Sequence, residues 1–243
     1  MPDNEAVSGI DSRPMSKPLP GPGEILALVL DLDVSDARFE PLAESLSARE
    51  QARRRSFKDP RHARRWATGR GLLREVLGAA VGIPPAEVVI RYGEHGKPCI
   101  DSSEGLEFNL SHSGSLALLV LGTCPVGADI ERHKPRRWAD VARRFYAPGE
   151  QEELFAAPHF EQENLFFRLW TCKEALLKCT GEGLSRSLRS YEMKLSEEGA
   201  SLAWATGIDA AEYSVFPIDP RPGYSAAAVA RGRSLVLQRR EWS

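Results

Sequence analysis

The sequence has 243 residues, and its 32 lysine and arginine residues against 34 aspartate and glutamate residues give a formal net charge of −2. This length suits one large domain or two small ones, and a content of 42% hydrophobic and 27% charged residues argues against a chain that is disordered throughout. The near-zero charge argues against a dedicated nucleic-acid binder, and no apolar run approaches the roughly 18 residues needed to span a bilayer.

The first half of the chain predicts a tail, a strand, helices and then short strands. Residues 1–23 are rich in proline, glycine, serine and aspartate, so we expect a flexible tail. The apolar run over residues 24–32 predicts a strand. Ser47 and Glu50 have the spacing of a capping box, and Asp59 before a proline is a second helix start. Short strands are expected over residues 88–92, 107–110 and 116–121.

The second half repeats this order of elements. A strand is expected over residues 126–130, and helical patterns follow over residues 138–146, 148–157 and 162–179. Five strands complete the half, over residues 191–195, 201–205, 213–218, 224–230 and 235–239. The repetition predicts an α+β protein of two similar subdomains, residues 24–125 and 126–243, each with an antiparallel sheet packed against helices. A cleft between two such lobes is an expected ligand site.

Two acidic residues stand at the end of a predicted strand. Asp129 and Glu131 are two positions apart, so both side chains face the same side of the strand. Like charges this close disfavour each other unless water or a cation lies between them, and paired oxygen ligands suit Mg²⁺. The alternative is a strand end whose acids face solvent, where acidic residues usually lie.

The predicted helix over residues 162–179 carries a second group of charges. Lys173 interrupts its apolar stripe, and Glu174 lies about 100° further round the helix. One interpretation makes Glu174 a third carboxylate for the metal, with Lys173 and Lys178 reaching phosphates. The alternative is a surface pair between Glu174 and Lys178, which would contribute about 0.2–0.5 kcal/mol.

Polar and basic residues of the first half suggest phosphate binding. Ser111 and His112 lie where a strand runs into a polar turn, and they can hydrogen-bond a phosphate or simply form a solvated turn. No hydrolase triad or G-x-S-x-G motif accompanies them. Lys97 adds a cation on another turn. A cluster of basic residues also lies between Arg49 and Arg74, where arginines can grip phosphates or form a solvated face: Arg53, Arg54, Arg55, Lys58, Arg61, Arg64, Arg65 and Arg70.

Taken in order, these motifs resemble a known family. The chain reads G-K-P at residues 96–98, F-N-L-S-H-S at 108–113, G-A-D-I-E at 127–131 and W-T-C-K-E-A-L-L-K at 170–178. This order and separation resemble the 4′-phosphopantetheinyl transferases of the larger type, which activate surfactin synthetase. The resemblance implies a pseudo-dimer of two similar α+β lobes, which agrees with the repeated order of elements.

The resemblance implies a role for each matched residue. Asp129, Glu131 and Glu174 match the acids that hold Mg²⁺ on the pyrophosphate of coenzyme A, the co-substrate. Glu174 also matches the proposed general base, acting directly or through water. The other matches are to coenzyme A contacts: Lys97, Ser111 and His112 to phosphates, Pro98 beside the nucleotide, Lys173 and Lys178 near the pyrophosphate, and Arg53, Arg65 and Arg70 on the N-terminal helices.

The implied reaction transfers 4′-phosphopantetheine to a serine of an apo acyl or peptidyl carrier protein and releases 3′,5′-ADP. Fatty-acid, polyketide and nonribosomal-peptide carriers are all compatible with the sequence, and the family type favours the last two. Glu182 departs from the family by placing an acid where a lysine is common, which bears on carrier contacts. Ala128, where the family often has Val or Ile, only loses volume.

We expect a cytoplasmic enzyme, monomeric because one chain supplies both lobes, with no membrane or nucleic-acid partner. The four cysteines form no C-x-x-C pair and the N-terminus has no signal-peptide pattern, so reduced thiols are expected. Two alternatives remain at this point. One is a non-catalytic module that binds nucleotides or nucleic acid through the Arg49–Arg74 cluster. The other is a different Mg²⁺-dependent phosphotransferase, although no P-loop or kinase motif is present.

Overall fold

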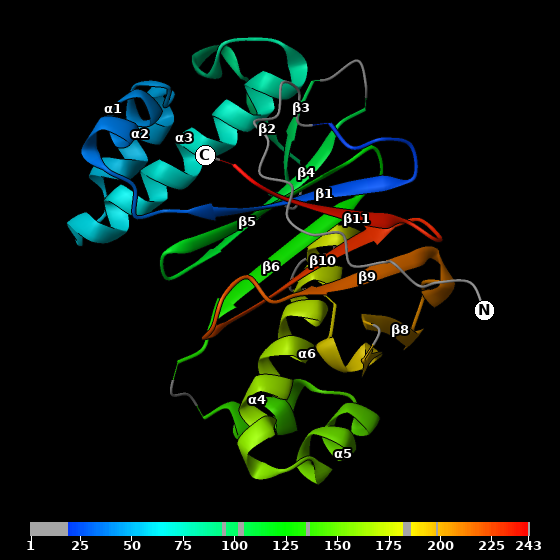
Figure 1. Ribbon diagram of the computed structural model, residues 1–243. Coiled ribbons are helices and arrows are strands. Elements are labelled where there is room, and N and C mark those ends of the chain that lie inside the picture. Colours follow the sequence, from blue (N-terminus) through cyan, green and yellow to red (C-terminus); the bar gives the residue numbers. More distant parts are fainter. Residues whose placement is uncertain are drawn as a thin grey trace.

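Figure 1 shows the chain as a computed structural model, which describes residues 19–93, 96–101, 105–134, 137–181, 186–197 and 199–242. The first half contains β1 (Glu24–Asp31), α1 (Asp36–Glu44), α2 (Ala48–Arg55), α3 (Pro60–Val81), β2 (Ile90–Tyr92), β3 (Pro98–Ile100), β4 (Glu107–Ser113) and β5 (Leu116–Gly122). The second half contains β6 (Val126–Arg132), α4 (Trp138–Phe145), α5 (Pro148–Ala156), α6 (His159–Thr180), β7 (Tyr191–Ser196), β8 (Gly199–Ala205), β9 (Tyr213–Ile218), β10 (Tyr224–Arg231) and β11 (Val236–Glu241).

The strands form two main sheets and a small hairpin. The first sheet has the order β11-β1-β5-β4, and the second, antiparallel throughout, has the order β6-β10-β9-β8-β7. Strand β11 pairs in parallel with β1, with Glu24 opposite Val236. The last strand of the chain therefore completes the sheet of the first half, across the expected subdomain boundary at residue 125. Strands β2 and β3 form a separate antiparallel pair.

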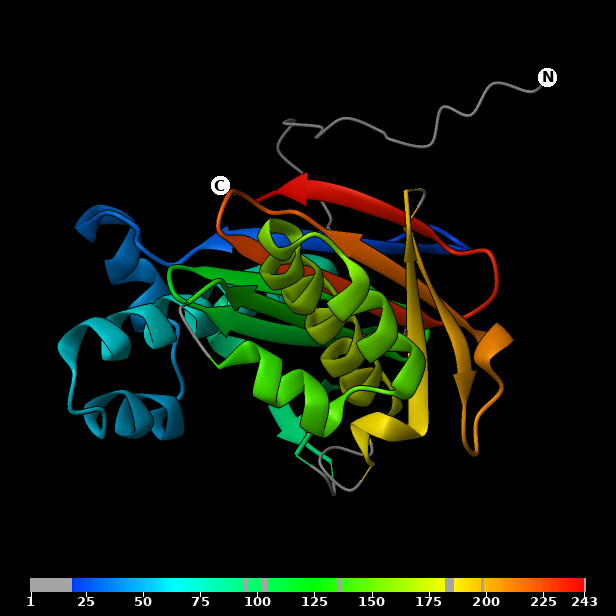
Figure 2. The same cartoon turned by 90° about the horizontal axis from the view of Figure 1, so that it is seen from below.

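Three hydrophobic clusters arrange these elements in layers. Helix α3 covers one face of the first sheet and helix α6 covers one face of the second, as Figure 2 shows from a second direction. The other faces of the two sheets pack on each other, with Leu118 and Val120 of β5 against Val126 and Ala128 of β6. Both halves thus have helices packed on a sheet. The α+β fold and the pseudo-dimeric arrangement predicted from the sequence are confirmed.

Helix α1 and strand β3 were not expected from the sequence. Pro41 lies inside α1 and hides its signal, because proline usually ends or kinks a helix. Ser35 nevertheless caps this helix by accepting a hydrogen bond from the Arg38 N–H, and the helix buries Phe39 and Leu42. A Cβ at Gly71 of α3 would lie 2.6 Å from the Leu42 backbone oxygen, so α1 packs directly on α3.

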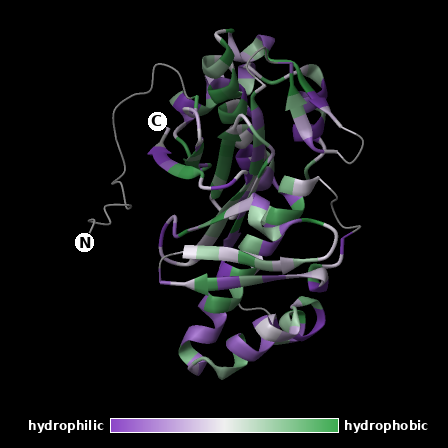
Figure 3. Cartoon of the chain, turned by 90° about the vertical axis from the view of Figure 1, so that its right-hand side faces the viewer, coloured by the Kyte–Doolittle hydropathy of each residue, from purple (hydrophilic) through white to green (hydrophobic). Residues whose placement is uncertain are grey.

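The capping signals did locate the next two helices. Ser47 and Glu50 form a complete capping box at the start of α2, and the Asp59 side chain accepts from the first N–H groups of α3. The expected tail over residues 1–23 includes Leu19, which packs against the hydrophobic cluster between α3 and the first sheet. Residues 1–18 lie outside the described residues. Figure 3 shows helices that carry hydrophilic and hydrophobic residues side by side, as helices with one buried face do.

Within the described ranges, no helix is long and apolar enough to cross a membrane.

Candidate active site

The acids of β6 meet hydroxyl groups of β4 across the boundary between the two subdomains. Ser111 Oγ donates to Asp129 Oδ1 at 3.0 Å, and Ser113 Oγ donates to Glu131 Oε2 at 3.0 Å. The two serines are two positions apart on β4, and the two acids are two positions apart on β6, so each strand presents one of its faces to the other strand. The alternation that placed Asp129 and Glu131 together in the sequence therefore holds, and their partners come from the other sheet.

Helix α6 adds a lysine and a third acid to this junction. Lys178 Nζ lies 2.6 Å from Asp129 Oδ1 and 3.1 Å from Ser111 Oγ. Glu174 stands one turn earlier on the helix. Burial raises its pKa, and the charges of Asp129 and Glu131 raise it further, while Lys178 acts in the opposite direction. Glu174 directly precedes Ala175, whose carbonyl oxygen lies against Gly127 of β6, and its charge interacts unfavourably with those of the two acids.

Gly127 of β6 makes this approach possible. A Cβ at this position would lie 2.0 Å from the Ala175 carbonyl oxygen and 2.4 Å from the Cys179 nitrogen. The backbone of α6 therefore lies directly on the strand, and a glycine is the only residue that leaves room for it. This close contact brings the Glu174 and Lys178 side chains within reach of Asp129.

We expect Gly127→Ala to lower the free energy of unfolding by about 1–3 kcal/mol, because the added methyl group must push α6 away from β6. The geometry of the junction should change with it, since Glu174 and Lys178 move with the helix. Urea denaturation measures the stability. Gly93→Ala is the matched control, because its nearest neighbour lies at an ordinary 3.7 Å. Equal stability of the two variants would contradict the interpretation.

The donor set of this junction fits a divalent cation. Asp129 Oδ2 is buried and has no hydrogen-bond partner among the described residues. Among the described residues, no group of three or more histidine, cysteine, aspartate or glutamate side chains is already arranged to hold a metal ion. Mg²⁺ needs no such cluster, because it binds through one or two carboxylates and completes its shell with water and substrate phosphate. An unpaired buried oxygen beside two further carboxylates meets that requirement.

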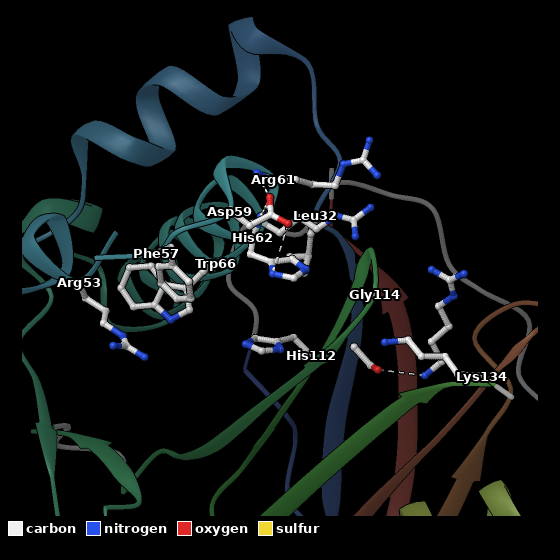
Figure 4. Close-up of a pocket in the computed structure, with 13 residues that line it drawn as sticks. Leu32, Arg53, Phe57, Asp59, Arg61, His62, Trp66, His112, Gly114 and Lys134 are labelled. Carbon is white, nitrogen blue, oxygen red and sulfur yellow. Dashed lines mark hydrogen bonds and ion pairs between the residues drawn. The ribbon is translucent and has the colours of Figure 1, made fainter. Parts of the chain in front are cut away.

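A large cavity of about 690 Å³ opens beside the junction, between the start of α3 and the β4–β5 turn. Figure 4 shows Arg53, Phe57 and Trp66 along one wall and His112 across from them. The Arg53 guanidinium lies over the Phe57 ring, 5.0 Å from its centroid, and Phe57 packs on Trp66. Arg65 also lines the cavity. The wall combines aromatic surface with cations, which suits an anionic ligand that has a flat apolar part.

A smaller cavity of about 220 Å³ lies on the side of Lys178. Its lining includes Lys97, which precedes β3, and Pro98, which begins it. Asn109 of β4 and Leu177 and Lys178 of α6 complete this part of the lining. Asn109 is largely buried, and its side-chain oxygen accepts the Ala128 N–H at 3.0 Å, which ties β4 to β6. Each cavity is therefore lined by a partner of one of the acids: Ser113, bonded to Glu131, in the large cavity and Lys178, bonded to Asp129, in the small one.

Comparison with known proteins decides the family. Residues 125–229 match the model of the 4′-phosphopantetheinyl transferase superfamily, and residues 33–123 match the model described as 4′-phosphopantetheinyl transferase, N-terminal. The 4′-phosphopantetheinyl transferase HetI of Nostoc sp. is 40% identical over 172 residues, covering 69% of this chain and 72% of that protein. The chain belongs to the 4′-phosphopantetheinyl transferase superfamily.

Two further relatives of this transferase come from Bacillus. The 4′-phosphopantetheinyl transferase psf-1 of Bacillus pumilus is 36% identical over 72% of this chain and 76% of that protein. The 4′-phosphopantetheinyl transferase Sfp of Bacillus subtilis (strain 168) is 29% identical over 85% of this chain and 92% of that protein. The resemblance drawn from the four motifs is therefore confirmed, and the protein is an enzyme of this class.

The structure of the transferase corrects the expected role of Lys173. Its side chain is 0% exposed, and its ammonium group donates to both Glu150 oxygens at 2.7 Å and to the Tyr191 carbonyl oxygen at 2.9 Å. A side chain buried in this way cannot touch a bound phosphate. Lys173 therefore serves the core of the second subdomain, and Lys178 alone of the two lysines reaches the carboxylates.

Ion pairs within the first subdomain occupy several arginines of the transferase. Arg70 and Arg74 both pair with Glu50 at 2.7 Å, and Arg65 forms a bidentate pair with Asp33. Arg65 still lines the large cavity, whereas Arg70 faces Glu50 and the Tyr92 hydroxyl. Of the three arginines expected to contact coenzyme A, Arg53 and Arg65 are thus at the cavity. Glu182 lies outside the described residues.

Sequence reasoning missed two residues that position the site of the transferase, Gly127 and Asn109. Both stand inside the motifs quoted above, in which only the charged and hydroxyl side chains indicate chemistry. A glycine within a strand usually marks a close backbone approach, and that signal was available at Gly127. The part played by Asn109 depends on a neighbour from another sheet, which no local pattern indicates.

Proposed function

We propose that this transferase moves 4′-phosphopantetheine from coenzyme A to a serine hydroxyl of an apo acyl or peptidyl carrier protein and releases 3′,5′-ADP. The serine oxygen forms a bond to the phosphorus that carries pantetheine. The bond from that phosphorus to the bridging oxygen breaks, and the serine proton passes to a base. The convergence of Asp129, Glu131, Glu174 and Lys178 is the observation that carries this proposal, together with one cavity lined by Ser113, the partner of Glu131, and another lined by Lys178.

Serine is a weak nucleophile at neutral pH and needs a base. Glu174 is the proposed base, acting directly or through a water molecule. Its raised pKa, caused first by burial and then by the neighbouring acids, makes it a better proton acceptor than an ordinary carboxylate. Lys178, already fixed on Asp129, is placed to neutralise charge that develops on the phosphates.

Coenzyme A would be held from both cavities. Arg53 and His112 are proposed phosphate contacts in the large cavity, and Arg65, which Asp33 holds in place, is a third. Lys97 and Pro98 are proposed contacts from the small cavity. Ser111 is a further proposed contact, because its hydroxyl accepts from Lys178, which lines the small cavity, and donates to Asp129.

Asp129, Glu131 and Glu174 are the proposed residues that would hold Mg²⁺, as the buried unpaired oxygen of Asp129 favours. When bound, the ion neutralises charge on the pyrophosphate and makes it a better leaving group.

Arg53→Ala is expected to raise the KM for coenzyme A by about tenfold, because a charged hydrogen bond to phosphate contributes about 1.5–3 kcal/mol. The kcat should change little, since Arg53 lies away from the carboxylates. Steady-state kinetics with a saturating carrier measures both constants. Arg55→Ala is the matched control: this arginine is exposed on the same helix, outside the described cavity lining. A KM that rises equally in both variants would remove Arg53 from the proposed contacts.

The proposed function is tested by incubating the protein with coenzyme A, Mg²⁺ and apo carrier proteins from fatty-acid, polyketide and nonribosomal-peptide systems. Intact mass spectrometry should show at least one carrier gaining the mass of a phosphopantetheine arm. Unchanged masses for all carriers would overturn the proposal. Light scattering on the same preparation tests the proposed monomer, and fractionation of cells tests the proposed cytoplasmic location.

A nucleic-acid module is less favoured. Four arginines of the Arg49–Arg74 cluster already pair with acids of their own subdomain: Arg64, Arg65, Arg70 and Arg74. Such pairs reduce the positive field that phosphate backbones require. The module would also leave the three carboxylates without a role.

A further inference from the structure

His112 and Ser113, the last two residues of β4, line the large cavity just before the β4–β5 turn. The second subdomain holds this turn in place. Gly114 and Ser115 form the tip of the turn. Tyr224, the first residue of β10, and Arg221, three residues before it, contact the tip from the other half of the chain.

The contact is close and hydrogen-bonded. The Ser115 N–H donates to the Tyr224 hydroxyl oxygen at 3.1 Å, and the two hydroxyl groups lie 3.3 Å apart. The Arg221 guanidinium donates to Ser115 Oγ and stacks over the Tyr224 ring, 5.3 Å from its centroid. A Cβ at Gly114 would lie 2.4 Å from the Tyr224 oxygen, and Gly114 has a φ of +62°. The turn therefore needs glycine both for its backbone and for the tyrosine.

The same arginine connects to the other wall of the cavity. Arg221 Nη1 lies 3.4 Å from Asp31 Oδ2, and Asp31 Oδ1 accepts the Asp33 N–H at 2.9 Å. Asp33 in turn holds Arg65, with its two oxygens 2.7 and 2.5 Å from the guanidinium nitrogens. The end of β1 thus joins Arg221 to a cation of the cavity wall.

We propose that Tyr224 and Arg221 are positioning residues, which hold the β4–β5 turn and, through it, His112 and Ser113 in the geometry that binds the nucleotide. The described lining of the large cavity includes Ser113 and Gly114 but neither Tyr224 nor Arg221, so the effect is indirect. Ser113 is also held from β6, because its hydroxyl donates to Glu131 and accepts the Arg132 N–H, so the effect is expected mainly on the binding of coenzyme A. This inference rests on the proposed function, since it assumes that coenzyme A fills the cavity.

Tyr224→Phe tests the contact by removing one oxygen atom and keeping the ring. We expect the KM for coenzyme A to rise about fivefold, as for the loss of a hydrogen bond, while kcat stays within about twofold. Arg221→Gln should act in the same direction. Amide hydrogen exchange, which needs no coenzyme A, should become faster in the peptide that contains residues 111–116. Tyr213→Phe, at the first position of the neighbouring strand β9, is the control and should change neither quantity.

The outcomes separate the two proposals. Wild-type protein that transfers nothing to any carrier overturns the proposed function. Active wild type with an unchanged KM in both Tyr224→Phe and Arg221→Gln overturns the positioning role. Faster exchange with an unchanged KM also overturns it, because the contact would then be structural only. A higher KM and faster exchange in both variants, with Tyr213→Phe unaffected, supports the proposal.

Discussion

Glu174→Gln is expected to lower the transfer rate by about 10²–10⁴-fold, the range that a positioned general base contributes. Glutamine keeps the shape of the side chain but can neither accept the serine proton nor bind a cation as a carboxylate does. The rate is measured with coenzyme A, Mg²⁺ and the best carrier, at saturating concentrations. A rate within about tenfold of wild type would remove Glu174 from the role of base.

The same substitution is expected to stabilise the metal-free protein at neutral pH. The pKa of Glu174 is raised in the folded state, first by burial and then by the charges of Asp129 and Glu131. Its ionised form therefore destabilises the fold at every pH above the raised pKa, and this penalty is absent below the ordinary carboxyl pKa. Glu174→Gln removes the penalty, so its melting temperature should exceed that of wild type at pH 7 but not below about pH 4.

Two other variants, one on the same helix and one at the same junction, serve as controls for the lower rate and the higher stability of Glu174→Gln. Glu163→Gln, at an exposed position of α6, should change neither the rate nor the stability. Added Mg²⁺ should raise the melting temperature of wild type more than that of Glu174→Gln, because a ligand that binds only the folded state stabilises it. Asp129→Ala should abolish transfer without the gain in stability, since Asp129 is paired with Lys178. A variant of Glu174 that is both inactive and destabilised would contradict the electrostatic argument.

Lys173→Met is expected to lower the free energy of unfolding by about 3–5 kcal/mol, because it leaves the buried Glu150 carboxylate without its partner. Both side chains are 0% exposed. Burial raises the pKa of Glu150 and lowers that of Lys173, and their mutual attraction offsets only part of this cost. Urea denaturation at pH 7 measures the loss.

A double variant separates the charge from the packing. Glu150 also accepts the N–H groups of Met193 and Ala147, each at 2.8 Å. In Glu150→Gln combined with Lys173→Met no charge stays buried, but the two N–H groups bond different oxygens of Glu150 and the amide offers only one acceptor oxygen. Only part of the lost stability should therefore return. Lys194→Met, on an exposed site of β7, is the control. A loss below about 1 kcal/mol in Lys173→Met would contradict the structural role given to the pair.

Local patterns predicted most of the elements that the structure contains. Period-two and helical patterns located strand β6 and helix α6, and the Ser47–Glu50 capping box began α2 at the residue where the structure begins it. Where a local rule was overridden, the prediction failed, as in α1, whose interior Pro41 is tolerated because the helix packs on α3. The parallel pairing of β11 with β1 joins segments over 200 residues apart, and no local pattern carries that information.

The sequence by itself determined the chemistry of this protein: the spacing of Asp129 and Glu131, the Lys-Glu motif and the order of the motifs identified the family. Only the tertiary structure decided which side chains face the site. Lys173 and Lys178 are five residues apart and so point about 140° away from each other around α6. The contact of α6 with Gly127 turns Lys178 toward Asp129, and the same rotation buries Lys173 on Glu150. The packing of one helix face therefore separated a residue of the site from a residue of the core.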